Sequence, residues 1–298
     1  MKKFFSIAAL ALVASLALTG CQPKTPADNG GTTPPPPQKA TIIVNGSDTM
    51  VNMGAALAEE FMKTKENIEV VVSGGGSGTG IASLINGSCD IAQSSRAMKQ
   101  EEKDNAGKQG TLHEVIVAFD GLAAVVHPSN PVKEMTLQDL AKIYRGEITN
   151  WKDVGGNDAN IVLLSRDTTS GTHVFFKEFV VQEDGKAKGA EFADQTMMMP
   201  STQAIVDELT NNVNAIGYVG LGYLKPSITA LGMKANADAP AVLPSVAAVQ
   251  DNTYGLARPL FFYIVGNLEG AMQTYIDYVL SPAGQKVVAD LSFVPISK

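Results

Sequence analysis

Short apolar runs alternate with helix-type patterns along most of the chain. Residues 41–44 and 68–72 are rich in β-branched side chains, which is typical of buried strands. Between them, Met53, Leu57 and Phe61 recur at four-residue spacing and therefore lie on one face of a helix. Strands that alternate with helices in this way predict an α/β fold with a mainly parallel sheet.

The same alternation continues to the end of the chain. Further strands are expected over residues 115–126, 161–164 and 260–265, and further helices over residues 81–85, 136–143, 174–180 and 271–280. The first of these strands is long and is interrupted at Gly121. The roughly 258 residues from Thr41 onward are a large number for one core and fit two lobes.

The first 20 residues have the pattern of a secretion signal. Lys2 and Lys3 precede an apolar stretch over residues 4–18, which is shorter than the roughly 20 apolar residues that a spanning helix needs. The small residues before Cys21 resemble the bacterial lipobox, in which the cysteine is acylated. We therefore expect residues 1–20 to be a lipoprotein signal peptide and Cys21 to be the lipidation site, with an ordinary cleaved signal as the alternative.

Residues 21–39 are rich in proline and glycine and include four consecutive prolines at 34–37. A segment with so few apolar side chains buries too little surface to offset its ordering entropy. Where it is polyproline-like, it extends by about 3 Å per residue. The pattern predicts a linker that holds the following domain away from a membrane, in the cell envelope on the extracytoplasmic side.

The net charge of the chain restricts the molecules that it is expected to bind. Without Lys2 and Lys3 the 23 basic residues fall to 21, against 30 acidic ones, so the chain from Cys21 onward has a formal charge of −9. Nucleic acid is therefore not an expected partner, because binding to its backbone depends on clustered basic residues.

With Cys21 acylated only Cys89 remains, so no intrachain disulfide is expected and Cys89 is predicted to be a buried, inert thiol.

Three expected strand-to-helix junctions share one chemistry. Residues 45–49, 73–80 and 166–172 each place hydroxyl groups and glycines where a helix begins. The first amides of a helix lack internal partners, and the helix dipole favours negative charge there. In open α/β sheets, ligands bind beyond the carboxyl ends of the strands, where these loops lie. Each loop alone is commonly only a helix cap, but the three together, one with Arg166, predict a shared anion site.

Other glycine-rich and catalytic motifs do not fit. The run at 74–80 does not match the dinucleotide fingerprint, and no lysine follows it as a P-loop requires. Neither Ser77 nor Ser170 lies in a nucleophile elbow, and the three histidines have no metal-ligand spacing. We therefore expect no enzymatic activity, no cofactor and no metal. His173 follows Thr172 and is expected on a helix surface, with a position lining the cleft as the alternative.

The quoted loops, with several further motifs, resemble a known family. From Thr41 to the C-terminus the chain is similar to the substrate-binding proteins of bacterial phosphate-specific ABC transporters, the PstS-like family, which has the two-lobed type II periplasmic binding-protein fold. The landmarks are GSDT at 46–49, GSGTG at 76–80, DIAQSSR at 90–96, IYRGEITNW at 143–151, RDTTSGT at 166–172 and AIGYV at 215–219.

The resemblance implies a set of anion ligands. The candidates are Ser47, Asp48, Thr49, the amide of Met50, Ser77, Ser95, Arg96, Arg166, Ser170, Gly171 and Thr172. In the best-known members an aspartate after the third strand accepts the ligand's proton, which allows phosphate and rejects sulfate. Here that position is Ser95. We expect Asp48 to substitute for it, with a helix cap as the alternative, and a structural ion pair is the alternative role for Arg96.

The resemblance also implies the arrangement of the lobes and the function. Residues 41–121 with 258–298 would form lobe 1 and residues 122–257 lobe 2, each a mainly parallel sheet flanked by helices, with two hinge crossings between them. The expected function is high-affinity binding of inorganic phosphate by a lipid-anchored monomer that delivers it to the permease of an ABC importer. The alternatives are a receptor for sulfate, molybdate or tungstate, and a secreted phosphoryl-transfer enzyme.

Overall fold

The structure is a computed structural model that describes residues 39–296. The expected signal peptide over residues 1–20, the lipidation site Cys21 and nearly all of the linker over residues 21–39 lie outside the described residues. Within the described range, every helix is too short or too polar to span a bilayer.

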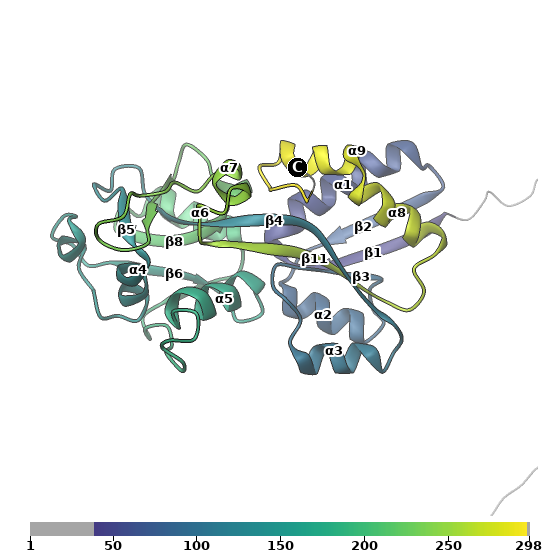
Figure 1. The fold of residues 1–298 in the computed structure, drawn as a ribbon, viewed down its shortest axis with the longest axis horizontal. Coiled ribbons are helices and arrows are strands. Elements are labelled where there is room, and N and C mark those ends of the chain that lie inside the picture. Colours follow the sequence, from purple (N-terminus) through teal and green to yellow (C-terminus); the bar gives the residue numbers. More distant parts are fainter. Residues whose placement is uncertain (1–38, 297–298) are drawn as a thin grey trace, which may run out of the picture. The chain divides into compact units, whose positions relative to one another are not determined.

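The N-terminal and C-terminal parts of the described chain together build one lobe. Its elements are β1 (Ala40–Gly46), η1 (Asp48–Met50), α1 (Val51–Thr64), β2 (Ile68–Ser73), α2 (Ser77–Ile85), β3 (Ile91–Ser94), α3 (Gln100–Gly107), β4 (Leu112–Val126), β11 (Ala257–Val265), α8 (Gly270–Leu280) and α9 (Pro282–Asp290). The strand order is β2-β1-β3-β11-β4, with β1, β2 and β3 parallel and β11 antiparallel to both of its neighbours. Helices α1, α8 and α9 cover one face of this sheet, and α2 and α3 cover the other (Figure 1).

The middle of the chain builds the other lobe. Its elements are β5 (Glu134–Thr136), α4 (Leu137–Tyr144), η2 (Trp151–Val154), β6 (Val162–Arg166), α5 (Gly171–Phe176), η3 (Lys177–Val181), β7 (Met197–Met199), α6 (Thr202–Asn211), β8 (Ala215–Gly220), η4 (Leu221–Tyr223), β9 (Thr229–Ala230), β10 (Gly232–Lys234) and α7 (Val246–Gln250). The C-terminal half of β4 continues into the order β4-β8-β6-β7, in which β8, β6 and β7 are parallel. Thr136 caps α4, since its Oγ1 accepts a hydrogen bond from the Asp139 amide at 3.0 Å.

Two long strands connect the lobes. β4 pairs with β11 from Leu112 to Gly121 and then changes partner, so that Leu122 pairs with Gly220 of β8. The two strands lie side by side where the lobes meet (Figure 1). The chain therefore crosses between the lobes near Gly121 in β4 and near Ala257 in β11.

Each lobe has its own hydrophobic core. The buried apolar side chains of one lobe come from residues 42–118 and 260–293, and those of the other come almost entirely from residues 122–256. Burial of apolar surface is the main force that holds each set together. This distribution supports the proposed division into residues 41–121 with 258–298 and residues 122–257.

The α/β prediction holds, and β4 and α5 are two expected elements that differ from it. β4 is continuous through Gly121, because its main chain stays paired while its partner strand changes. The helix expected over residues 174–180 begins earlier, at Gly171, because the Ser170 hydroxyl caps it, and residues 177–181 form a π-helical turn. Cys89 is buried as predicted, and burial raises the pKa of its thiol to about 11.

Candidate functional site

Four loops meet where the two lobes face each other. Three of them follow the carboxyl ends of β1, β2 and β3, and the fourth follows β6. Parallel strands place these ends at the same edge of a sheet, so loops from one lobe are neighbours. The hydroxyl-rich loops predicted at 45–49, 73–80 and 166–172 are among them, and hydrogen bonds bring them together.

Three buried serines of lobe 1 form the centre of the site. Ser47 Oγ donates to Ser95 Oγ at 3.0 Å, and Ser77 Oγ lies 3.3 Å from Ser95 Oγ. The Ser95 amide donates to Ser77 Oγ at 3.0 Å, which holds the loop after β3 against the start of α2. All three serines are at most 1% exposed. Ser95 therefore puts a neutral hydroxyl in the middle of the cluster, at the position where the resemblance implies an aspartate.

A pair of threonines joins the two lobes. Thr49 Oγ1 and Thr172 Oγ1 are 2.7 Å apart, and both side chains are buried. Ser170 next to them is a helix cap, because its hydroxyl accepts hydrogen bonds from the amides of Thr172 at 3.2 Å and His173 at 3.4 Å. Thr49 and Thr172 thus present hydroxyl groups at the interface, while Ser170 orders the start of α5.

The loop of lobe 2 closes tightly on lobe 1 through glycine main chain. The Gly78 amide donates to Thr169 O across the interface at 2.9 Å. A Cβ atom at Gly171 would lie only 2.7 Å from Ser95 Oγ and 2.9 Å from Ser77 Cβ. This approach is closer than any side chain permits, so position 171 requires glycine while the lobes are in contact.

Arg166 is buried, and its partners lie in the segment between β7 and α6. Its Nε donates to Met199 O at 3.3 Å, its Nη2 to Pro200 O at 3.2 Å, and its Nη1 to Thr202 Oγ1 at 2.8 Å. Its Nη1 also lies 3.4 Å from Asp48 Oδ2. Each guanidinium nitrogen therefore has a protein partner, and Arg166 orders this segment of lobe 2.

Asp48 links the lobes. Its Oδ2 accepts from the Thr202 amide at the first residue of α6, at 2.8 Å, and its carbonyl oxygen accepts from the Tyr223 hydroxyl at 2.9 Å. The alternative prediction, that Asp48 caps the helix after it, is wrong, because α1 begins without a side-chain cap. Asp48 instead binds the start of α6 in the other lobe. The Met50 amide donates to Ser47 O at 3.1 Å within the turn before α1.

Arg96 forms an ion pair within lobe 1. Its Nη1 and Nη2 each lie 2.7 Å from a carboxylate oxygen of Glu102, and Nη1 also donates to Ala97 O at 3.0 Å. Such two-point pairing between a guanidinium and a carboxylate is strong and geometrically specific. The structural ion pair, one of the two roles left open by the sequence, is therefore present, while Arg96 Nε has no partner among residues 39–296.

Two charged residues at the hinge were missed by the sequence-based prediction. Arg258 and Asp120 lie directly opposite each other in the β4–β11 ladder, and Arg258 Nη2 donates to Asp120 Oδ2 at 3.2 Å. The same nitrogen donates to Thr172 Oγ1 at 2.8 Å. Burial raises the pKa of Asp120, and the positive charge of Arg258 opposes that rise. The signal in the sequence is one charged residue inside each of the apolar runs 115–126 and 257–265.

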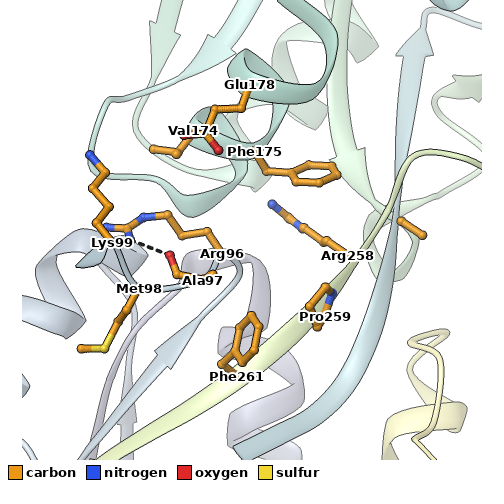
Figure 2. A pocket seen from close by; sticks show the side chains of 11 residues that line it. Arg96, Ala97, Met98, Lys99, Val174, Phe175, Glu178, Arg258, Pro259 and Phe261 are labelled. Carbon is orange, nitrogen blue, oxygen red and sulfur yellow. Dashed lines mark hydrogen bonds between the residues drawn. The ribbon is translucent and has the colours of Figure 1, made fainter. Parts of the chain in front are cut away.

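Arg258 also lines a pocket of about 410 Å³ between the lobes (Figure 2). The walls come from the loop after β3, from α5 with the turn after it, and from β11. Its charged residues are Arg96, Lys99, Arg258 and Glu178, so cations outnumber anions. The ring of Phe175 stacks on the Arg258 guanidinium, with Cζ 5.3 Å from the ring centroid.

The arrangement offers hydrogen-bond donors and a positive charge to an oxyanion. Hydroxyl groups and amides from both lobes meet in a buried place, next to a guanidinium. Hydrogen bonds to an anion are strong where water is excluded. Residues 39–296 hold no cluster of His, Cys, Asp and Glu that could bind a metal ion.

His173, at the start of α5, is only 6% exposed, so the predicted surface position is wrong. Its Nδ1 lies 3.2 Å from Ser165 Oγ, and its ring packs at a tilt against Phe192, with the ring centroids 4.8 Å apart. α5 begins three residues earlier than predicted, so His173 lies in its first turn. Burial lowers the pKa of His173 below its ordinary value of 6.5, an effect that nearby Lys177 reinforces and Asp167 and Glu191 oppose.

This lowered pKa predicts a pH-dependent stability. The unfolded chain binds the His173 proton more readily than the folded one, so the stabilising contribution is complete above pH 6.5 and is lost as pH falls below it. Each unit of pKa shift corresponds to about 1.4 kcal/mol. Urea unfolding at pH 7.5 and at pH 5 measures the effect. Between these two pH values, the unfolding free energy of wild type should fall by more than that of His173→Asn. Equal losses would show that another group causes the pH dependence.

Two lobes joined by two crossing strands, with hydrogen-bond donors from both at their interface, define a hinged substrate-binding protein. A family model for the PBP superfamily domain matches residues 31–283. Protein SphX from Synechococcus elongatus is 34% identical over 271 residues, which cover 87% of this chain and 78% of that protein. Phosphate-binding protein PstS from Borreliella burgdorferi is 30% identical over 257 residues, which cover 86% of this chain and 90% of that protein.

Solved structures agree with these relatives. A protein from Clostridium perfringens, assigned as a phosphate ABC transporter substrate-binding protein and solved with bound phosphate, matches with a TM-score of 0.78 and 31% identity over 86% of this chain and 100% of that chain. An ABC-type phosphate transport receptor from Vibrio cholerae matches with a TM-score of 0.68 and 29% identity, with coverage of 86% and 100%. The chain belongs to the PBP superfamily and, within it, to the PstS-like phosphate-binding proteins. The fold class expected from the sequence is thereby confirmed.

Proposed function

We propose that this chain binds inorganic phosphate outside the cytoplasm and delivers it to an ABC importer, without catalysing a reaction. The observation that carries the proposal is the buried set of hydroxyls to which both lobes contribute, Ser47, Thr49, Ser77, Ser95 and Thr172. Such donors bind an oxyanion strongly because the low local dielectric strengthens charge-assisted hydrogen bonds. The names of the relatives and the phosphate bound to the Clostridium perfringens protein support phosphate as that anion.

In the proposed binding mode, the anion lies between the hydroxyls of lobe 1 and the first turn of α5 in lobe 2. The direct ligands are Ser47, Thr49, Ser77, Ser95, Gly171 and Thr172. Ser170 and Arg166 act indirectly, since Ser170 caps α5 and Arg166 orders the segment before α6. The amide of Met50 and the guanidinium of Arg96 already have protein partners, which makes them weaker candidates.

Binding would be coupled to a hinge motion. A ligand that touches both lobes stabilises the closed form by its differential affinity for that form. The lobes would rotate about β4 and β11, because these two strands carry the chain from one lobe to the other. The closed form is then the shape that the permease recognises.

The cellular context belongs to the same proposal. A lipid anchor at Cys21 and the linker over residues 21–39 would hold a monomer near the permease on the extracytoplasmic side. The lipobox-like sequence supports the anchor, and the names of the relatives support the transport role. Mass spectrometry of the mature N-terminus tests the anchor, because an unmodified Cys21 would contradict it.

The function is tested by isothermal titration calorimetry with phosphate, sulfate and molybdate. Phosphate should bind with a stoichiometry of one and outcompete the other anions. Tighter binding of sulfate or molybdate would favour the second candidate, a receptor for another oxyanion, which the neutral Ser95 hydroxyl keeps open. Calorimetry is preferred to intrinsic fluorescence because the only tryptophan, Trp151, is buried in the core of lobe 2 and donates to Asn214 O.

Asp48→Asn tests whether Asp48 stabilises the contact between the lobes or accepts the ligand's proton. In the structure its carboxylate is held by the Thr202 amide and lies near Arg166, so it stabilises the contact between lobes. We therefore expect Asp48→Asn to weaken phosphate and sulfate alike, by about fivefold. Calorimetry with both anions measures this ratio. A selective loss of phosphate affinity would instead identify Asp48 as the acceptor of the ligand's proton.

A further inference from the structure

Arg258 has unused hydrogen-bonding capacity in a buried position. Its side chain is 2% exposed, and only Nη2 has partners, Asp120 Oδ2 and Thr172 Oγ1. Its Nε and Nη1 have no hydrogen-bond partner among residues 39–296. A guanidinium carries five N–H donors, of which three belong to these two nitrogens. Buried donors are nearly always paired, so three unpaired ones beside a polar cluster point to a ligand.

We propose that Arg258 is a direct cationic ligand of the bound anion and that Asp120 positions its guanidinium. This inference rests on the proposed function and deepens it, because it names the residue that supplies positive charge to the same site. The other candidate ligands around the anion are neutral hydroxyls and amides. A buried cation next to them would account for tight binding by a protein whose overall charge is negative.

The neighbouring arginines are less available. Arg166 uses all three of its guanidinium nitrogens on Met199, Pro200 and Thr202. Arg96 directs both of its terminal nitrogens to Glu102, which leaves only Nε without a partner. Arg258 is the arginine that contacts a candidate ligand hydroxyl and also retains a free terminal nitrogen.

Asp120 fixes Arg258 without neutralising the side that faces the anion. The two residues are cross-strand neighbours, and their contact uses Nη2 alone. An anion at Nε or Nη1 would be closer to the guanidinium than to the carboxylate, so attraction would exceed repulsion. The Phe175 ring covers one face of the guanidinium (Figure 2), which leaves the N–H groups, in the plane of the group, as its free edge.

The position of Arg258 links binding of the anion's charge to closure of the two lobes. Arg258 lies on β11 where the chain crosses between lobes, and its bond to Thr172 reaches the fourth loop only when α5 is close. Thr172 in turn contacts Thr49 of the first loop. An anion bound by Arg258 and these two threonines would therefore contact the hinge strand and both lobes together.

The test is calorimetric titration of phosphate into wild type, Arg258→Met, Arg258→Lys and the double variant Arg258→Met/Asp120→Asn. We expect at least about 30-fold weaker binding for Arg258→Met and for the double variant, and an intermediate loss for Arg258→Lys, which keeps the charge without the planar fork. Arg145→Met is the matched control, because Arg145 also pairs with carboxylates but lies at the end of α4 in lobe 2. It should bind phosphate as wild type does.

The variants distinguish failure of the Arg258 inference from failure of the proposed function. The double variant also removes the Asp120 charge that Arg258→Met leaves unpaired, so it provides the comparison if Arg258→Met alone fails to fold. Arg258→Lys keeps the positive charge and therefore separates the contribution of the charge from that of the planar guanidinium. Affinity within about twofold of wild type in folded Arg258→Met, or in the folded double variant, would overturn the inference and leave the proposed function intact. If wild type itself does not bind phosphate, the proposed function fails instead.

Discussion

Gly171→Ala should bind phosphate roughly 10- to 100-fold more weakly than wild type. The new methyl group would lie 2.7 Å from Ser95 Oγ and 2.9 Å from Ser77 Cβ, and both side chains are buried on the opposite lobe. Overpacking of this kind costs about 1–3 kcal/mol. Because the strain exists only when the lobes touch, the variant relieves it by opening. Its affinity should therefore fall while its thermal stability without added phosphate stays near that of wild type.

Calorimetry and small-angle X-ray scattering check this prediction together. Wild type should contract when phosphate is added, and Gly171→Ala should contract less or only at higher phosphate concentration. Gly107→Ala is the matched control, since a Cβ at Gly107 meets nothing within 4 Å and its backbone is not in the left-handed region. Wild-type affinity in Gly171→Ala would show that the loops do not approach this closely in the bound protein.

Arg166→Met should lower the free energy of unfolding by about 3–5 kcal/mol. Arg166 is 1% exposed and binds two carbonyl oxygens, the Thr202 hydroxyl and the Asp48 carboxylate. Removal of one partner from a buried charged network leaves the others unpaired, which is the costly case. Urea unfolding monitored by circular dichroism measures the loss. Phosphate affinity should fall as well, because the segment that Arg166 orders holds Asp48 of lobe 1.

The same experiment distinguishes a supporting role for Arg166 from that of a direct ligand. A direct ligand with spare donors would lose affinity and little stability, whereas the observed partners predict that both decline. Arg145→Met is again the control, because Arg145 pairs with partly exposed Glu147 and Glu183 and should lose only about 1 kcal/mol. An unchanged unfolding free energy in Arg166→Met would show that these contacts contribute little.

The sequence predicted those parts of the site that depend on local pattern. Alternating strands and helices indicate the fold class, and hydroxyls with glycines at helix starts indicate the loops that meet at Ser95 and Thr172. Helix starts attract such residues for reasons that act over a few positions, so a single sequence displays them.

The parts that depend on distant segments were not predictable in the same way. The partners of Arg166 lie more than 30 residues further along, between β7 and α6, so its direction follows from strand pairing that local pattern does not encode. Arg258 and Asp120 are 138 residues apart and meet through the β4–β11 register. Their isolation within apolar runs was a visible signal, but the sequence alone did not show which charges would pair. His173 was misplaced because the start of α5 was set three residues too late.

The contacts of Asp48 have a consequence for transport kinetics. The Thr202 amide and the Tyr223 hydroxyl bind it directly across the interface, with no need for an anion between them. Such bonds shift the equilibrium between open and closed forms by a fixed amount, whether or not phosphate is bound. On the proposed function, they would lengthen the residence time of captured phosphate and raise the share of unloaded receptors that present the closed shape to the permease. A permease that takes phosphate from this protein would have to break the hydrogen bonds between the lobes. Because unloaded protein also closes, the closed shape alone would not tell the permease that phosphate is bound.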